Sequence, residues 1–411
     1  MTLFWLPLVL FILLSEFILE TAASLLNLKA LHLDIPALFQ NAIDKEGYAK
    51  SQAYTRASTR FSLLQQTVFL VLTIVFLLCG GFPLLDTFAQ FFGKGPISTG
   101  LIFISCLLFL IGLINLPFSL YSTFSIEEQF GFNKTTLKTF FLDQLKIVIL
   151  SFSLGTPLIG LILWLFETTE DMAWIYCWIG VTIFSITFQF LAPVLIMPLF
   201  NKFTPIHDES LKEKIMIYCK KESFRLIGVY TMDGSTRSTK LNAFFTGLGR
   251  FKKIVFYDTL LQKLSHDEIL AILAHEMGHY KYHHLYKQLV LTILQSALIF
   301  YLLSLTLDNV SLAQAFGLRQ PSTYTSLVIF TFLYTPINLL LSCLSNALSR
   351  HYEFQADSYA ESSNKYGQTL IQALKKLSIE NLSNLTPHPF FVFLHYSHPP
   401  VAKRIQELDI I

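Results

Sequence analysis

The segment LAILAHEMGHYKYHHLYKQLVLTILQ (residues 270–295) joins a metal-type motif to a stretch that is apolar enough to enter a membrane. Two histidines flank a glutamate in the order His275, Glu276, His279. Because residues four apart share one face of a helix, both imidazoles can reach one tetrahedral zinc ion, with the glutamate beside it. Residues 265–268 (SHDE) form a capping-box pattern that predicts where this helix begins. The segment therefore predicts a metal-binding helix at the edge of a bilayer.

The composition of the whole chain indicates an integral membrane protein. Of the 411 residues, 53% are hydrophobic and only 14% are charged, against about 25% charged in ordinary soluble domains. So little charge cannot cover the surface of a soluble protein of this length. The net charge of +2 is too balanced to indicate nucleic-acid binding. The 5 cysteines form no CxxC pair, so neither a disulfide framework nor a cysteine zinc site is predicted.

Seven apolar stretches reach the length that a membrane-spanning helix needs. They are residues 3–26, 63–85, 99–122, 147–166, 172–200, 289–307 and 325–348. The first is interpreted as a retained helix and not a signal peptide, because it has no basic start and Glu16 and Glu20 stand where a cleavage site belongs. The fifth contains Pro193 and Pro198, which predict a kink.

The basic residues indicate the orientation of these spans. All but two of the 30 lysines and arginines lie in connections that follow odd-numbered spans, and the two exceptions are Lys94 and Arg319. Because cytoplasmic connections carry the positive bias, we expect the N-terminus outside and both polar pieces in the cytoplasm. The sequence predicts four parts. Residues 1–200 form a five-span membrane region, and residues 201–288 form an insert with the HExxH motif. Residues 289–348 contain spans six and seven, and residues 349–411 form a C-terminal segment that completes the metal site.

A zinc site with two histidines needs a third protein ligand and an open position for water. The segment SRHYEFQAD supplies the best candidate, Glu353, directly after the seventh span. Asp357 lies four residues on and can orient a ligand histidine. From residue chemistry alone, Glu353 is equally an ordinary solvated charge. We expect His283 and His284 to be surface residues at the membrane edge, since one helix cannot wrap three ligands around one ion.

Two further segments flank the motif in the sequence. Strand-like runs near residues 226–232, 241–246 and 253–257 predict a small sheet, whose free edge beside a metal could hold an extended peptide. Near the C-terminus, YSHPPVAKRI places His398 and Arg404 in a proline-braced segment. Either could donate to the oxyanion of a tetrahedral intermediate, and either could be a surface residue.

Taken together, HEMGH and SRHYEFQAD, with LNAFFTG before them and YSHPPVAKRI after them, closely resemble the type I CAAX prenyl proteases, which are integral-membrane zinc metallopeptidases. Residues 48–66 and 124–136 resemble the N-terminal region of the same family. The resemblance implies a mainly α polytopic fold, with seven transmembrane helices around an intramembrane chamber and a small cytoplasmic α+β zinc-protease domain.

The resemblance also implies a role for each residue of the site. It implies one Zn²⁺ per chain, with Glu276 as general base and Asn242, followed by Ala243 and Phe244, holding the substrate. It places His398 and Arg404 near the tetrahedral intermediate, and Asp357 behind the ligands. The implied metal ligands are His275, His279 and Glu353.

The implied activity is a zinc metalloendopeptidase that cleaves near the C-terminus of prenylated or membrane-associated proteins. Compact loops and a C-terminal ELDII without a retrieval signal favour a bacterial inner-membrane protein over one of the endoplasmic reticulum. Bacteria generally lack prenylated proteins, so a membrane-protein quality-control protease without a prenyl requirement is the alternative. A transporter or channel with incidental histidines is a third hypothesis, because Glu16 and Glu20 share a helical face within the first span and could border a water-filled path.

Overall fold

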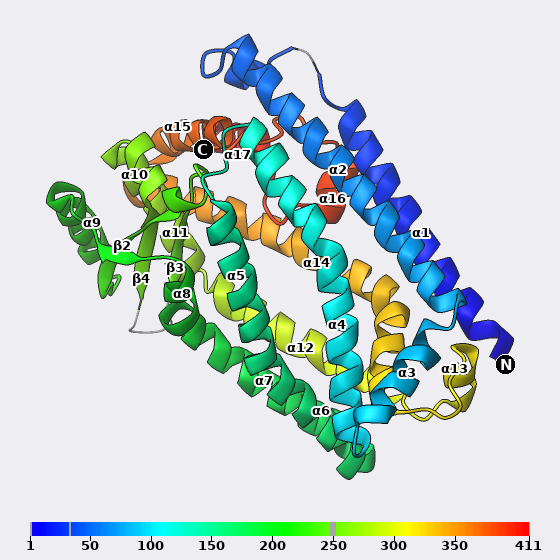
Figure 1. Ribbon diagram of the computed structural model, residues 1–411. Helices are drawn as coiled ribbons and strands as arrows, with labels where there is room; N and C mark the ends of the chain where they lie inside the picture. The colour runs from blue at the N-terminus through cyan, green and yellow to red at the C-terminus, as the bar shows by residue number, and fades with distance from the viewer. Residues whose placement is uncertain (1, 33, 247–251, 411) are drawn as a thin grey trace.

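The computed structural model (Figure 1) describes residues 2–32, 34–246 and 252–410, and most of them are helical. Seven helical segments are long and apolar enough to cross a membrane, which confirms the predicted number of spans. They are Phe4–Lys29, Lys45–Leu78, Pro96–Glu127, Leu137–Thr168, Glu170–Phe200, His284–Ser304 and Thr323–Asn364. The protein is therefore a mainly α polytopic membrane protein.

The helices of the membrane region begin and end as follows. They are α1 (Thr2–Lys29), α2 (Lys45–Leu78), α3 (Gly81–Phe92), α4 (Pro96–Tyr121), α5 (Leu137–Leu150), α6 (Thr156–Thr168), α7 (Ala173–Leu191), α8 (Met197–Phe200), α12 (His284–Ser304), α13 (Val310–Ala315) and α14 (Thr323–Asn364). A π-helical segment, Ala192–Ile196, joins α7 to α8 and contains Pro193. Proline lacks the N–H that a regular turn needs, so the fifth span is interrupted where the sequence predicts a kink.

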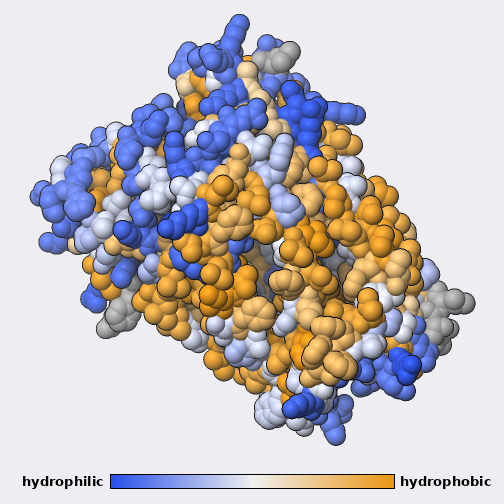
Figure 2. Space-filling view, viewed as in Figure 1, coloured by the Kyte–Doolittle hydropathy of each residue, from blue (hydrophilic) through white to orange (hydrophobic). Residues whose placement is uncertain are grey.

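The spans enclose polar space as well as apolar contacts. A cavity of about 330 Å³ between α2 and α4 is lined by serines and by Gln65 and Asn115, whose side chains are joined by a 2.8 Å hydrogen bond. A second cavity of about 420 Å³ lies between α12 and α14, where Gln295 donates to Ser345. Figure 2 shows that the outer face is nevertheless a broad apolar band, with hydrophilic residues gathered toward the two ends.

The remaining elements form the polar domain at one end of the spans (Figure 1). Its strands are β1 (Phe203–Pro205), β2 (Gly228–Met232), β3 (Ala243–Thr246) and β4 (Lys253–Tyr257). Its helices are α9 (Glu209–Lys221), α10 (Asp258–Lys263), α11 (His266–Lys281), α15 (Gly367–Glu380), α16 (Pro389–His395) and α17 (Val401–Ile410). The sheet order is β1-β2-β4-β3, with β2 and β4 parallel and the other pairs antiparallel. Three strands match the prediction; β1 was missed, since a three-residue strand that ends in proline carries almost no pattern.

Helix α11 is embedded in the core of this domain. Its apolar residues, among them Leu273 at 0% exposure, pack in one buried cluster with Phe256 of β4, Leu370 of α15 and Ile405 of α17. The HExxH helix is therefore fixed by sheet and helices on several sides, and the histidines on it have little freedom to move.

Helix α14 connects the membrane region to this domain without a break. It runs for 42 residues, from Thr323 to Asn364, and so passes through the predicted boundary at 348/349. Its last turns carry Glu353 and Asp357, which are both buried. A rigid helix thus delivers the C-terminal part of the site directly from the seventh span.

The two ends of the molecule differ in charge as the loop count predicts. Lys94 follows α3 and Arg319 follows α13, and Figure 1 places both helices near the N-terminus, away from the polar domain. The other basic residues belong to connections that lead to the opposite end.

Candidate functional site

A capping box sets the start of α11, as the sequence predicts. The backbone N–H of Glu268 donates to the Ser265 hydroxyl at 3.3 Å, and the backbone N–H of Ser265 donates to the Glu268 carboxylate at 2.8 Å. Lys376 of α15 donates to the same carboxylate. Two otherwise unpaired helix donors are thereby satisfied, which stabilises the helix that carries the motif.

A close helix crossing brings the two halves of the site together. Gly278 of α11 lies against Ala356 of α14, and a Cβ at Gly278 would stand 2.8 Å from the Cα of Ala356. Only glycine allows this approach, because any side chain would meet backbone. The crossing sets Glu353 of α14 opposite the two histidines of α11.

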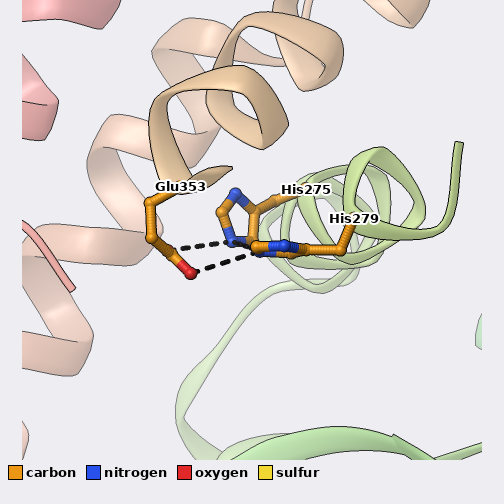
Figure 3. A group of neighbouring side chains, drawn as sticks. All are labelled: His275, His279 and Glu353. Carbon is orange, nitrogen blue, oxygen red and sulfur yellow. Dashed lines mark hydrogen bonds and ion pairs between the residues drawn. The ribbon is translucent and has the colours of Figure 1, made fainter. Parts of the chain in front are cut away.

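The three expected metal ligands converge on one point (Figure 3). One ligand atom from each of His275, His279 and Glu353 lies within 4.8 Å of the others. The Nε2 atoms of the two histidines are 3.2 Å apart. They lie 3.4 Å and 3.2 Å from the two carboxylate oxygens of Glu353. Two imidazoles and one carboxylate are a donor set that zinc accepts in catalytic sites, where a fourth position stays open.

The burial of Glu353 supports this fit. Its side chain is about 5% exposed. Among the described residues no hydrogen bond reaches its Oε2 atom, and the nearest cation, NH1 of Arg404 at 3.2 Å, is shared with the Asp357 carboxylate. An ionised carboxylate held out of water without full hydrogen bonding is costly unless a cation compensates it. The alternative that Glu353 is an ordinary solvated charge is therefore wrong.

Asp357 and Arg404 contact two of the expected metal ligands, His275 and Glu353 respectively. Asp357 Oδ1 is 2.8 Å from Nδ1 of His275. Burial and the Arg404 charge lower the pKa of His275, but its hydrogen bonds to Asp357 and Glu353 outweigh them and raise that pKa to about 9. The carboxylates of Asp357 and Glu353 therefore make the surroundings of this imidazole electronegative.

Arg404 is buried, so the alternative of a surface residue is wrong. Its Nε and NH2 atoms donate to the two oxygens of Asp357 at 2.8 Å and 2.6 Å, and its NH1 lies 3.2 Å from Glu353. The guanidinium is thus engaged by two carboxylates of α14. This favours a role in holding those carboxylates over direct contact with an oxyanion.

Most of the predicted site residues line one cavity of about 620 Å³. They are Asn242, Ala243, His275, Glu276, His279, Glu353, His398 and Arg404. Among the described residues, no hydrogen bond or ion pair reaches the Glu276 carboxylate, so it lines the cavity without a competing partner. His398 is largely exposed at the opening, with Nε2 3.3 Å from Glu353.

The expected substrate strand forms one wall of this cavity. Strand β3 lies at the edge of the sheet, next to β4 only. Asn242 precedes it and is exposed, and its carbonyl accepts a hydrogen bond from Tyr257. Phe244 lines a second cavity of about 330 Å³, which also contains Glu276 and His279. The catalytic glutamate candidate therefore lies between two cavities along one strand edge.

Two residues near the site were not found by sequence reasoning. Asn381 at the end of α15 accepts a hydrogen bond from the backbone N–H of Leu241 and donates to its carbonyl. His284, expected at the surface, is 2% exposed and contacts His279. The expectation failed because it assumed one continuous helix, whereas α11 ends at Lys281 and the chain turns back.

The chain matches two family descriptions that together cover nearly all of it. Residues 24–202 match the CAAX prenyl protease N-terminal region with five membrane helices. Residues 205–411 match peptidase family M48.

Curated relatives resemble the chain along most of its length. The CAAX prenyl protease 1 homolog of Arabidopsis thaliana is 36% identical, with 96% of this chain and 95% of that protein covered. CAAX prenyl protease 1 of Saccharomyces cerevisiae is 34% identical, with 92% and 89% covered. The Homo sapiens homolog is 33% identical, with 91% and 88% covered.

A solved structure has the same overall architecture. The crystal structure of S. mikatae Ste24p matches with a TM-score of 0.94 at 32% identity, covering 98% of this chain and 99% of that one. The likeness therefore extends to the membrane spans and the polar domain alike.

Proposed function

The chain belongs to the CAAX prenyl protease family of M48 peptidases, and from this premise we propose that it is a zinc endopeptidase that cleaves near the C-terminus of prenylated or membrane-associated proteins. Family membership makes it a multi-pass membrane metalloprotease, in place of the transporter or channel hypothesis. The finer points, namely the metal, the prenyl group and the role of each residue, are proposals.

The convergence of His275, His279 and Glu353 carries the proposal. We assign the metal to zinc, because two imidazoles and one carboxylate suit it and leave a position for water. Zinc bound there supplies Lewis-acid chemistry, which polarises a carbonyl and lowers the pKa of bound water to about 7.

Three residues of the chain take separate roles in the proposed reaction: one transfers the proton, one stabilises the oxyanion and one positions the metal ligands. Glu276 faces the cavity without a competing partner, so we assign it as the base that takes a proton from the attacking water and returns it to the leaving amine. His398 stands at the opening, where its ring can donate to the oxyanion that develops. Arg404 holds Asp357 and Glu353 in place and so positions the ligands indirectly.

The substrate peptide is assigned to the edge of β3. An extended peptide can add to an exposed strand edge through backbone hydrogen bonds, while alternate side chains enter pockets. Asn242, Ala243 and Phe244 lie along that edge, between the two cavities that share Glu276. This path would bring a peptide bond past the metal ligands.

We further propose that the polar domain lies on the cytoplasmic side, with the N-terminus outside. The basic residues gather at the end of the spans that carries this domain, which supports this orientation. The relatives reported above are eukaryotic, so they give no support to a bacterial source. A prenylated substrate is accordingly the first choice.

The test uses the full chain, purified in detergent, with a farnesylated CAAX peptide and its unprenylated counterpart. We expect one zinc per chain, cleavage that stops on chelation and returns with Zn²⁺, and faster cleavage of the farnesylated peptide. Equal rates on both peptides would instead favour the quality-control alternative. Zinc-loaded protein that cuts neither peptide nor an unfolded membrane protein would contradict the proposal.

A further inference from the structure

The Nδ1 atoms of the two histidines in the HExxH motif contact different kinds of group. Nδ1 of His275 faces the Asp357 carboxylate at 2.8 Å, whereas Nδ1 of His279 faces another imidazole, Nδ1 of His284, at 3.1 Å. A metal-binding histidine needs a partner on its second nitrogen, because that partner sets the ring orientation and the tautomer.

His284 is fixed firmly enough to serve as such a partner. It is 2% exposed, and its ring stacks on Tyr352 with centroids 4.1 Å apart and planes 11° apart. Its other nitrogen, Nε2, lies 2.9 Å from the amide oxygen of Gln355. Ring stacking and two polar contacts leave it one orientation.

The backbone at the junction of α11 and α12 makes this placement possible. His283 has φ 58° and ψ 31°, in the left-handed region. Few residues other than glycine enter that region, and histidine is among those that do so more readily. The left-handed residue ends α11 and turns the chain, so that His284 contacts His279 of the motif although it is the first residue of the membrane-spanning helix α12.

With the Gln355 amide oxygen toward His284, as the structure places it, one assignment of donors and acceptors fits all the contacts. The Gln355 amide oxygen can only accept, so Nε2–H of His284 donates to it and Nδ1 of His284 keeps its lone pair. That lone pair accepts from Nδ1–H of His279. Nε2 of His279 is then free of a proton, and it is the atom that faces Glu353 at 3.2 Å. The Gln355 NH₂ group continues the chain toward His351.

We propose that His284 is a positioning residue for the metal site, which holds His279 in the ligating tautomer, and that Gln355 holds His284 in turn. The proposal rests on the metal site assigned above. Helix α14 would then control all three ligands, since it supplies Glu353 itself, Asp357 behind His275, and Tyr352 and Gln355 behind His284.

The first test replaces His284 in the full chain and measures Zn²⁺ affinity by competition with a chelator. His284→Phe keeps the stacked ring and removes both polar contacts, and we expect at least about tenfold weaker binding, the low end for loss of such a partner. His284→Asn carries its amide oxygen near the position of Nδ1 and should restore affinity to within about threefold of wild type. His283→Asn, a neighbouring substitution that tolerates the left-handed backbone, is the control and should bind zinc as wild type does.

The second test asks whether His284 and Gln355 act as one unit. Gln355→Leu should weaken Zn²⁺ binding in the wild-type background but add nothing to His284→Phe, as coupled residues do. The Co²⁺-loaded protein gives a readout that general destabilisation would not move, and its visible absorption bands should shift in His284→Phe. If His284→Phe does not fold, the Zn²⁺ affinity of Gln355→Leu alone tests whether the pair supports the metal site.

Three outcomes would overturn the inference while the proposed function stands. The first is wild-type Zn²⁺ affinity in a folded His284→Phe variant, and the second is an equal loss of Zn²⁺ affinity in His284→Phe and His284→Asn. The third is that the losses of Zn²⁺ affinity caused by His284→Phe and Gln355→Leu add up in the double variant. A wild-type chain that binds no Zn²⁺ would overturn both.

Discussion

Gly278 of α11 lies so close to Ala356 of α14 that a Cβ on the glycine would stand 2.8 Å from the Cα of Ala356 and 3.0 Å from its carbonyl oxygen. This contact fixes the distance between the helix that carries two of the proposed metal ligands and the helix that carries the third. The fourth residue of the HExxH motif, Gly278, is thus a packing position as well as a spacer.

Gly278→Ala should therefore weaken metal binding without removing a ligand. The added Cβ must push two backbones apart, and buried overpacking costs about 1–3 kcal/mol. We expect a lower unfolding temperature together with a weaker Zn²⁺ affinity, measured by thermal melts and chelator competition. Gly112→Ala on α4 is the matched control, because its Cβ would meet nothing within 4 Å. Equal behaviour of the two variants would mean that the crossing has no bearing on the site.

Glu276→Gln should retain the metal and lose the reaction. The amide has nearly the same shape but cannot accept the proton of the attacking water, and loss of a general base lowers turnover by at least about a hundredfold. Zinc content and peptide cleavage measured on the same preparation check this. Near-native cleavage by a zinc-loaded variant would remove Glu276 from the mechanism.

Much of this arrangement can be predicted from the sequence. The spans are predictable because a bilayer requires long apolar runs, and the α11 helix because its capping box, apolar face and histidine spacing are all local. The proposed metal ligands His275, His279 and Glu353 were predictable because two belong to a local motif and the third directly follows the seventh span. Topology alone therefore places all three on one side of the membrane.

The contacts that pack the site were not predictable in this way. Gly278 and Ala356 lie far apart in the sequence, and their approach depends on the angle at which two helices cross. The burial of Arg404 could not be predicted, because it depends on how α17 packs against α14. His284 was misjudged because a helix break at His283, which depends on one left-handed residue, has no clear sequence signature.

Asp357→Asn should weaken metal binding while the ligands stay unchanged. The substitution removes the charge that faces His275 at 2.8 Å and leaves the buried Arg404 with a neutral partner. Loss of such a partner typically costs about 10–100-fold in metal affinity. Chelator competition measures this loss, and Asp409→Asn, an exposed carboxylate near the C-terminus, should show none. An unchanged affinity in Asp357→Asn would show that His275 needs no anion behind it.

Asn381→Ala should affect the substrate more than the metal. Asn381 pairs with both backbone groups of Leu241, the residue before Asn242, but it contacts none of the ligands. Two hydrogen bonds of about 1 kcal/mol each correspond to a loss of about 10–30-fold in kcat/KM if the strand shifts. Steady-state kinetics with a peptide substrate, alongside zinc content, check this. A loss of zinc in step with activity would point to general unfolding instead.

The Glu268 capping box should make stability depend on pH in a defined direction. Burial raises the pKa of Glu268, but hydrogen bonds from Lys376 and Ser265 outweigh it and lower that pKa below its ordinary value of 4.5. A carboxyl whose folded pKa is depressed stabilises the fold above its unfolded pKa, and this stabilisation is lost as pH falls through the folded pKa. Glu268→Gln should therefore destabilise the protein near pH 7 by about 1 kcal/mol, and the difference from wild type should shrink as pH falls below about 4.5. Denaturation at a series of pH values measures it, with the exposed Glu407→Gln as control. A difference that stays constant across that range would mean that the carboxylate charge contributes nothing to the start of α11.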